Sequence, residues 1–464
     1  MDIKPLAASF RDEGNFVYKK DGIVYRQINK GFTSDYLSLM ESGLYDSLIS
    51  DKYIVNHDEM PINYAADKRS ADIILKPEQI EFITYPYEWC FSQLKDAALL
   101  TLEVCMQSIE YGMILKDSSA YNIQFHKGRA IFIDTGSFSK YEEGGKWEGY
   151  QQFCKHFLSP LLLISKVNIQ LSNLLKVYID GVPLDLTSRL LPVKSWLSWS
   201  IFAHIHAHSI SQNMYSDKGS KSSSIKKISK VGILGLLNSL HSAISNLQWK
   251  IPKTEWGDYY NNTNYSSNSS FEKKNIVLSM AQKITPSLTV DLGANDGLYS
   301  RIVAETGSMV ISADIDPVAV ESNYIKSKGD TKTNIIPIIQ DLTNPSASIG
   351  WAHSERESLK SRSSTGVDLV MSLALVHHIA ISNNVPFYKI AQYFSKLGEH
   401  LLIEFIPKSD SQVKKMLSSR KDIFTEYSIE YFELEFQKFY ELMDKVKILN
   451  SERTLFLMKS KVYL

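Results

Sequence analysis

The chain has 464 residues, a length that predicts roughly two to four domains. Hydrophobic residues make up 44% and charged residues 22%, which excludes wholesale disorder, a collagen-like repeat and a disulfide scaffold. Lys plus Arg and Asp plus Glu both number 51, and the part from Phe271 onward is balanced by itself, so binding to nucleic acid through overall charge is disfavoured.

Cysteine usage and hydropathy indicate a compartment. Cys90, Cys105 and Cys154 show no CxxC spacing, which favours a reducing environment over a disulfide framework or a zinc site. Apolar runs fall short of the ~20 residues of a membrane-spanning helix, and the charged N-terminus is unlike a secretion signal. We therefore expect a cytoplasmic protein without a transmembrane segment.

The first predicted elements form a small α+β lobe. The segment FVYKKDGIVYRQI is typical of a β-hairpin that turns at Asp21 and Gly22. A helix is expected next, over residues 34–49.

Residues 115–138, LKDSSAYNIQFHKGRAIFIDTGSF, hold the clearest motif of the N-terminal half. Asp117 and Asn122 form D-x4-N, and Asp134 follows Asn122 by 12 residues at the end of an apolar strand. This pattern resembles protein kinases and aminoglycoside-phosphotransferase-like enzymes. The resemblance implies that Asp117 is a base, that Asn122 and Asp134 hold the Mg²⁺ of ATP, and that Arg26 replaces the usual strand lysine.

This N-terminal motif departs from the kinase pattern. Lys116 precedes the first aspartate, Thr135 and Gly136 replace an aromatic–Gly pair after Asp134, and a glycine-rich phosphate loop is missing. An active phosphotransferase, a catalytically silent kinase-like domain and chance similarity therefore remain alternatives for a domain over residues 1–208.

A histidine cluster and two polar stretches follow. His204, His206 and His208 suggest a metal site, but the HExxH glutamate and an acid cluster are lacking, which favours packing. Residues 209–230 hold eight Ser and five Lys and predict an exposed linker. A helix is expected over 231–247 and a second polar segment over 259–270, so 209–270 is assigned as a linker region with a connecting helix.

From residue 271 onward, helices and strands alternate. This order predicts a mainly parallel α/β sheet covered on both faces, with a terminal antiparallel hairpin. The expected helices are 271–283, 299–305, 318–328 and 385–396, the expected strands are 288–292, 309–313, 335–339, 367–373 and 401–406, and the hairpin joins 446–449 to 454–459.

A candidate cofactor site lies at the ends of these strands. The segment TVDLGANDGLYS places Asp291, Gly293 and Gly297 in a turn between a strand and a helix, where glycine lets the backbone approach a ligand. Asp314 follows Gly293 by 21 residues at the end of the next strand, and Asp341 ends the third. Ligands bind at this edge in open α/β sheets.

These residues resemble the class I S-adenosylmethionine-dependent methyltransferases. The resemblance covers residues 271–464 and implies a Rossmann-like seven-stranded sheet with a terminal antiparallel hairpin. It also implies cofactor binding by Asp291, Gly293, Ala294, Asn295, Gly297, Asp314, Ile315, Asp341, Leu342 and Leu373. Asn295 stands where many members have glycine, and an NAD-binding domain is the disfavoured alternative because the third glycine of its motif is lacking.

The acceptor side of this site has three catalytic candidates. His377 and His378 follow the fourth strand, and either can take a proton during methyl transfer or merely pack at the helix start. Glu404 lies in the next strand, and the stretch EFIPKSDSQVKKML resembles bacterial nodulation-related methyltransferases, which implies a carbohydrate-like acceptor. A polar insertion, WAHSERESLKSRSSTG, with His353, Glu355 and Glu357, is expected as a solvated loop or a lid.

Three functions are consistent with these patterns. The leading one is an S-adenosylmethionine-dependent methyltransferase that acts on a small-molecule or glycan acceptor, which the kinase-like region helps to bind or position. The second is a bifunctional phosphotransferase–methyltransferase that uses ATP and Mg²⁺ as well. The third is a non-catalytic interaction protein.

Overall fold

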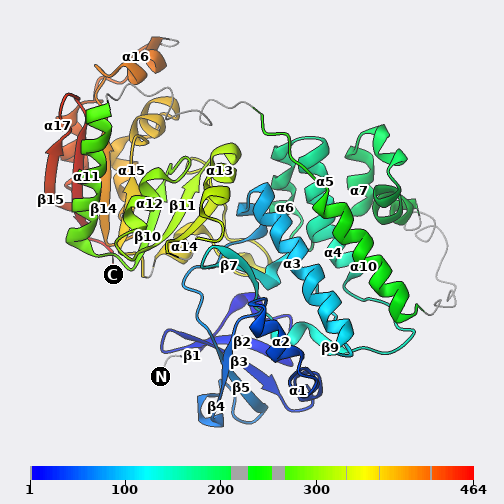
Figure 1. The fold of residues 1–464 in the computed structure, drawn as a ribbon. Coiled ribbons are helices and arrows are strands. Elements are labelled where there is room, and N and C mark those ends of the chain that lie inside the picture. Colours follow the sequence, from blue (N-terminus) through cyan, green and yellow to red (C-terminus); the bar gives the residue numbers. More distant parts are fainter. Residues whose placement is uncertain are drawn as a thin grey trace. The chain divides into compact units, whose positions relative to one another are not determined.

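The computed structural model describes residues 3–210, 228–252, 267–330, 332–364, 366–418 and 421–463. The chain divides into two compact units, whose elements are labelled in Figure 1. The first comprises Met1–His126, Ala130–Lys250 and Ser348–Arg356, and the second comprises Lys127–Arg129, Ile251–Ala347 and Glu357–Leu464.

The first unit opens with a five-stranded antiparallel sheet in the order β1–β2–β3–β5–β4. The predicted hairpin is confirmed, because β2 pairs with β3 and Asp21 and Gly22 adopt φ angles of 51° and 82°, which an Asp-Gly turn accommodates. The strands are β1 (Ile3–Pro5), β2 (Asn15–Lys20), β3 (Ile23–Asn29), β4 (His57–Met60) and β5 (Ala71–Pro77).

The prediction of one helix over residues 34–49 is wrong. Two helices, α1 (Thr33–Glu41) and α2 (Leu44–Ser50), are separated by Gly43, whose φ is 76°. A residue in the left-handed region cannot continue a right-handed helix, and glycine adopts this conformation readily. The chain therefore changes direction between α1 and α2.

The rest of the first unit is mainly helical. Its longest helix, α3 (Phe91–Glu110), is buried along most of its length. The other helices are α4 (Tyr150–Phe153), α5 (Ser159–Lys166), α6 (Leu174–Val177), α7 (Leu184–Leu190), α8 (Trp199–Ile201) and α10 (Lys230–Ser245). Short strands pair as β6 (Met113–Leu115) with β9 (Phe138–Lys140), and β7 (Ile123–His126) with β8 (Arg129–Phe132).

Helix α10 confirms the helix predicted over residues 231–247. It packs against α3, and Nζ of Lys95 donates hydrogen bonds to the carbonyl oxygens of Ser245 and Leu247 at 2.7 and 2.9 Å. The connecting helix thus belongs to the first unit. Most of the predicted polar linker lies outside the described residues, so the boundaries after residues 208 and 270 stay predictions.

The second unit is built on a seven-stranded mixed sheet in the order β12–β11–β10–β13–β14–β16–β15. The five predicted strands between residues 288 and 406 pair in parallel, and the terminal hairpin is antiparallel, so the expected α/β architecture is confirmed. The strands are β10 (Leu288–Leu292), β11 (Met309–Asp314), β12 (Asn334–Ile339), β13 (Leu369–Ser372), β14 (His400–Phe405), β15 (Tyr440–Lys447) and β16 (Thr454–Ser460).

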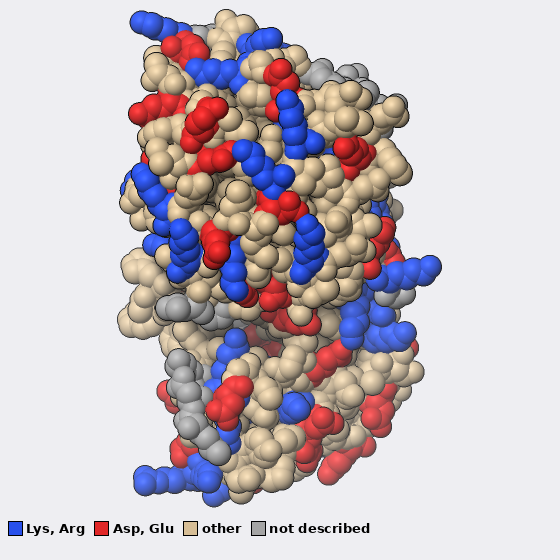
Figure 2. All heavy atoms as spheres, turned by 90° about the vertical axis from the view of Figure 1, so that its left-hand side faces the viewer, with Lys and Arg blue, Asp and Glu red and all other residues tan. Residues whose placement is uncertain are grey.

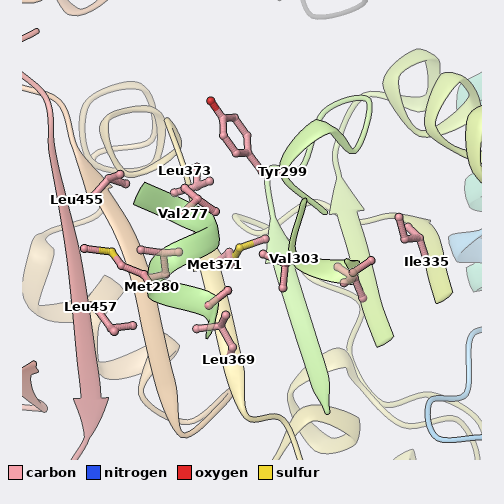
Figure 3. Close-up of a cluster of buried hydrophobic side chains, with 14 of the residues drawn as sticks. Val277, Met280, Tyr299, Val303, Ile335, Leu369, Met371, Leu373, Leu455 and Leu457 are labelled. Carbon is pink, nitrogen blue, oxygen red and sulfur yellow. The ribbon is translucent and has the colours of Figure 1, made fainter. Parts of the chain in front are cut away.

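Helices cover both faces of this sheet. Successive side chains of a strand point to opposite faces, so Leu402 packs with α11 and α12 whereas Phe405 stacks among aromatic rings from α15 and α17. Figure 3 shows Val277 and Met280 of α11 against the first face. The helices are α11 (Ser267–Ile284), α12 (Leu298–Ala304), α13 (Pro317–Ser327), α14 (Leu359–Ser363), α15 (Phe387–Phe394), α16 (Ser411–Ser418) and α17 (Ile429–Phe436).

The surface agrees with the balanced composition. Figure 2 shows basic and acidic side chains interspersed over one face of the molecule.

The three cysteines are buried free thiols. Among the helices of the described residues, none is both long and apolar enough to cross a membrane.

A buried ion pair stands inside the core of the second unit. Nζ of Lys273, on α11, donates to Oε2 of Glu404, on β14, at 2.7 Å, and the two side chains are 2% and 0% exposed. The same oxygen accepts the backbone N–H of Ala374 at 2.8 Å, and the Lys273 ammonium lies 4.6 Å from the ring centre of Tyr299. The pair therefore ties α11 and α12 to two neighbouring strands.

Replacement of Lys273 by Met is expected to destabilise the fold by about 3–5 kcal/mol, because it leaves the Glu404 carboxylate buried without its partner. The additional substitution Glu404→Gln should restore most of this loss. Urea unfolding of the full chain, followed by circular dichroism, measures both.

The matched control is Lys283→Met on the same helix. Lys283 is half-exposed and pairs with Asp444 at the surface, so its loss should cost less than about 1 kcal/mol. Equal effects at the two lysines would contradict the assignment of the buried pair as a structural tie.

Candidate cofactor site and acceptor edge

The predicted glycine turn joins β10 to α12. Gly293 and Gly297 have φ angles of 74° and 78°, and the backbone N–H groups of Gly293 and Ala294 donate to the carbonyl oxygen of Ala313 at 2.8 and 3.1 Å. Because Ala313 belongs to the neighbouring parallel strand β11, these bonds fix the turn against the next strand end. The turn thus stands where the doubly wound architecture binds ligands.

Asp291 lies beneath this turn as a buried carboxyl. Its Oδ2 accepts a hydrogen bond from Oγ of Ser300 at 2.6 Å, and Ser300 lies 2.8 Å from Oγ of Ser312. Burial raises the pKa of Asp291 to about 7, and the nearby Asp314 acts in the same direction. A cationic ligand group placed beside Asp291 would therefore stabilise its charged form.

Asp314 ends β11 and is also buried. Its two oxygens accept the backbone N–H groups of Asn295 and Asp316, each at 2.8 Å. Burial raises its pKa to about 6 despite these bonds. Asn295, which replaces a family glycine, has a φ of 51°, a conformation that asparagine tolerates, so the turn keeps its shape.

The remaining predicted cofactor residues lie at the same sheet edge in different environments. Leu373 is buried just after β13, whereas Ile315 is 55% exposed. Asp341 and Leu342 follow β12 and are half-buried, and Oδ1 of Asp341 accepts the backbone N–H of Thr343 at 2.8 Å. Asp341 thus stabilises its own turn and keeps its second oxygen for other contacts.

His377 and His378 lie where β13 leads into a π-helical turn, His378–Ser382. Their ring centres are 4.1 Å apart. His377 is 2% exposed, and its Nδ1 is without a hydrogen-bond partner among the described residues. Burial lowers the pKa of His377 well below its ordinary value and that of His378 to about 4, so both rings are neutral bases at pH 7.

Glu404, the third catalytic candidate, has its carboxylate engaged inside the protein. Oε2 binds Lys273 and the backbone N–H of Ala374, and Oε1 lies 3.8 Å from Nη1 of Arg453. Arg453 also donates from Nε to Asp410 at 2.8 Å. These contacts fit a residue that positions the strand edge.

In the first unit, the D-x4-N motif and its downstream aspartate converge. Nη2 of Arg26 lies 2.6 Å from Oδ1 of Asp134, and Oγ of Ser137 donates to the other oxygen of Asp134 while accepting from Nδ2 of Asn122 at 2.9 Å. Burial and the nearby Asp134 raise the pKa of Asp117. The predicted Arg26, Asp117, Asn122 and Asp134 therefore form one polar cluster.

The HIHAH histidines take part in packing. Nδ1 and Nε2 of His204 lie 2.9 Å from the Tyr150 hydroxyl and 3.1 Å from Oγ of Ser239. His206 stacks on Trp196, with ring centres 4.1 Å apart. Among the described residues, no group of three or more His, Cys, Asp or Glu is arranged to hold a metal ion.

The polar insertion is solvated in part, since His353 and Glu357 are exposed, but two of its residues are held by contacts within the first unit. Glu355 is 2% exposed and accepts two hydrogen bonds from Arg11, from Nε at 2.9 Å and from Nη2 at 3.1 Å. The guanidinium of Arg356 lies 4.0 Å from the ring centre of Tyr121, which precedes Asn122. Residues 348–356 are thus part of the first unit.

No protein-family model matches the chain. A curated relative, the nodulation protein NoeA of Rhizobium meliloti (strain 1021), is 32% identical over 460 residues, which cover 97% of this chain and 95% of the relative. The chain belongs to the NoeA family. This relationship confirms the predicted resemblance to nodulation-related proteins along nearly the whole length of the chain.

Solved structures also align with parts of the chain. The bifunctional kinase-methyltransferase WbdD matches with 14% identity and a TM-score of 0.30, over 47% of this chain and 45% of its own. The N-methyltransferase NodS from Bradyrhizobium japonicum WM9 matches with 12% identity and a TM-score of 0.31, over 42% of this chain and 98% of its own.

Sequence reasoning missed two residues of the NoeA-family chain, Lys273 and Arg453, which surround Glu404. A signal for Lys273 is present, since it precedes Val277 and Met280 by four and seven residues and so shares their apolar helix face. A lysine on such a face predicts a buried anionic partner. For Arg453 the turn between the hairpin strands gives no comparable signal.

Replacement of Gly297 by Ala should destabilise the second unit by more than about 2 kcal/mol. The new Cβ would lie 2.1 Å from Oδ1 of Asn323, in addition to the strain of a left-handed alanine. Asn323 cannot withdraw, because its Nδ2 donates to Ser312 at 2.7 Å. Urea unfolding of the full chain, followed by circular dichroism, measures this loss.

Gly307→Ala is the control for this substitution. Gly307 has a φ of 93° with open space around the added Cβ, so only left-handed strain, about 1 kcal/mol, is expected. If Gly297→Ala were as mild as Gly307→Ala, the close packing of the turn would not matter for stability.

Proposed function

We propose that the chain is an S-adenosylmethionine-dependent methyltransferase that acts on a small-molecule or glycan acceptor. The observation that carries this proposal is the pair of buried carboxyls, Asp291 and Asp314, at the ends of adjacent parallel strands beside a glycine turn. Asp314 suits the two hydroxyls of a ribose, and Asp291 suits a cationic group. The methyltransferase resemblance of this segment assigns them the same roles.

The residues present fit this cofactor. An added Cβ at Gly297 would strike Asn323, so the turn is held tightly against α13, and Asp291 is a buried acid that gains from a nearby positive charge. When bound, S-adenosylmethionine supplies a methyl group on a positively charged sulfur. We infer that Gly293, Ala294, Asn295 and Gly297 shape the pocket, as the methyltransferase resemblance implies.

The acceptor-side chemistry is assigned to the histidines. Direct displacement at a methyl group needs alignment of the acceptor and, for a hydroxyl acceptor, removal of one proton. Nδ1 of His377 is buried and lacks a partner among the described residues, so a donor hydroxyl would satisfy it. We assign His377 as the base, with His378 beside it, and Glu404 as a positioning residue for the Ala374 corner.

Binding of S-adenosylmethionine should strengthen as the pH rises from 5 to 7. The pKa values of about 6 for Asp314 and about 7 for Asp291 mean that both carboxyls lose protons in this range, and the charged forms bind the cofactor. As the pH falls, we expect the dissociation constant to rise about tenfold per pH unit between the two pKa values, where Asp291 alone must lose a proton, and about a hundredfold per pH unit below the pKa of Asp314, where both acids must lose one. Calorimetry at a series of pH values measures this slope.

The same raised pKa values have the opposite effect on the stability of the protein without cofactor, which falls as the pH rises. Both acids bind protons more tightly when folded than at their ordinary pKa of 3.8, so their contribution to stability is present at low pH and is lost as the pH rises toward 7. Thermal unfolding without cofactor checks this sign.

Asp314→Asn tests the cofactor assignment directly. Loss of charged hydrogen bonds to a ribose should weaken S-adenosylmethionine binding about 10- to 100-fold at pH 7.5 and flatten the pH slope. Asp330→Asn, a surface change in the same unit, should have no effect. Wild-type protein that binds no cofactor, or an Asp314→Asn variant that binds normally, would exclude the proposal and favour a non-catalytic protein.

One observation favours a second function. The cluster of Arg26, Asp117, Asn122 and Asp134 agrees with the kinase resemblance, so a bifunctional phosphotransferase–methyltransferase is the alternative to a kinase-like scaffold that helps to bind or position the acceptor. In that case Asn122 and Asp134 hold Mg²⁺, and Asp117 accepts the proton of the attacking hydroxyl.

Calorimetry with ATP and Mg²⁺ separates these roles. An active site predicts binding that Asp134→Ala abolishes and that Asp72→Ala, an exposed change on β5, leaves intact. A wild-type chain that does not bind ATP and Mg²⁺ would instead identify the first unit as a scaffold.

A further inference from the structure

A hollow of the second unit lies apart from the predicted cofactor residues. Its volume is about 170 Å³, and it lies between residues 380–387 and residues 423–431. The first segment follows β13 through the turn that starts at His378, and the second lies beyond the end of β14. Because β13 and β14 are parallel neighbours, both segments leave the sheet at its ligand-binding edge, on the side of the histidines.

The floor of this hollow is firmly anchored. The Tyr427 hydroxyl donates to the carbonyl oxygen of Ile406 at 2.8 Å, just after β14. The Phe387 ring lies 5.1 Å from Tyr427 and 5.4 Å from Phe432, centre to centre, within an aromatic cluster under the hollow. The floor therefore exists before a ligand arrives, which reduces the entropy that binding must overcome.

The lining is graded by exposure, and its rim holds the exposed apolar residues Ile423 and Pro386 as well as polar side chains. The buried aromatic residues Phe387 and Tyr427 form the floor, and the half-buried Phe424 and Tyr431 form the wall. The exposed side chains of Asn384 and Glu426 supply the polar part of the rim. A sugar ring has the matching character, with a C–H face for aromatic contact and hydroxyls around its edge.

The charge of the lining limits the kind of ring. Among the described lining residues Glu426 is the one acidic side chain, and Lys and Arg are absent. An acceptor that carries phosphate or carboxylate at this point would face Glu426 without a compensating cation. An uncharged sugar or an amino sugar meets no such repulsion.

We propose that this hollow, here named the ring site, binds one sugar ring of the acceptor that carries neither phosphate nor carboxylate. The proposal rests on the proposed methyltransferase function and specifies its acceptor. Tyr431 and Phe424 contact the face of the ring, Glu426 and Asn384 bind its polar edge, and the next part of the acceptor extends toward His377.

Saturation-transfer difference NMR on the full chain, with S-adenosylmethionine present, tests the ring site. The probes are methyl β-D-glucopyranoside, glucosamine and glucose 6-phosphate. We expect binding of the first two and at least tenfold weaker binding of the phosphate. Tyr431→Ala should weaken the first two about tenfold, whereas Tyr388→Ala, an exposed tyrosine outside the lining, should not.

Charge reversal gives an independent readout. Glu426→Lys should weaken glucosamine and strengthen glucose 6-phosphate relative to wild type. The ring site is overturned if the sugars do not bind while S-adenosylmethionine does, if Tyr431→Ala binds them like wild type, or if glucose 6-phosphate is preferred by the wild-type chain. Calorimetry of S-adenosylmethionine on the same samples reports separately on the proposed function, because the Tyr431 and Glu426 variants should keep normal cofactor binding.

Discussion

A single buried charge pair fixes the geometry on which the second unit depends. The Lys273 ammonium and the Glu404 carboxylate are both buried, and a buried ion pair is tolerated only when each charge keeps close partners. The geometry of this ion pair determines where α11 lies against β14. The Glu404 carboxylate also accepts the backbone N–H of Ala374, which has a φ of 51°. The corner from which the histidines project is therefore set by electrostatics inside the core.

Local patterns predicted the second unit well because its parallel strands are short apolar runs, and Gly293 directly follows the first while Asp314 ends the second. Residues 288–292 were predicted without a boundary error for this reason. The first strand of the terminal hairpin was placed too late, at 446, because β15 is an edge strand whose exposed side chains include Glu441 and Lys445. Polar edge strands lack the burial pattern from which a strand is recognised.

The first unit was harder to predict because its contacts join distant parts of the chain. The spacing of Asp117, Asn122 and Asp134 did identify a polar cluster, since one motif carries all three. By contrast, Glu355 and Arg11 are 344 residues apart, and no sequence motif around either residue predicts that the two side chains pair. Gly43, which ends α1, was hidden in an otherwise continuous apolar pattern.

The assignment of Ser348–Arg356 to the first unit bears on how this protein can be divided. A chain that begins at residue 271 carries Glu355 and Arg356 but lacks Arg11 and Tyr121, which satisfy them in the full chain. A fragment of that kind leaves the Glu355 carboxylate without the Arg11 hydrogen bonds and the Arg356 guanidinium without the Tyr121 ring. The two units are therefore better studied by point substitution in the full chain than by truncation.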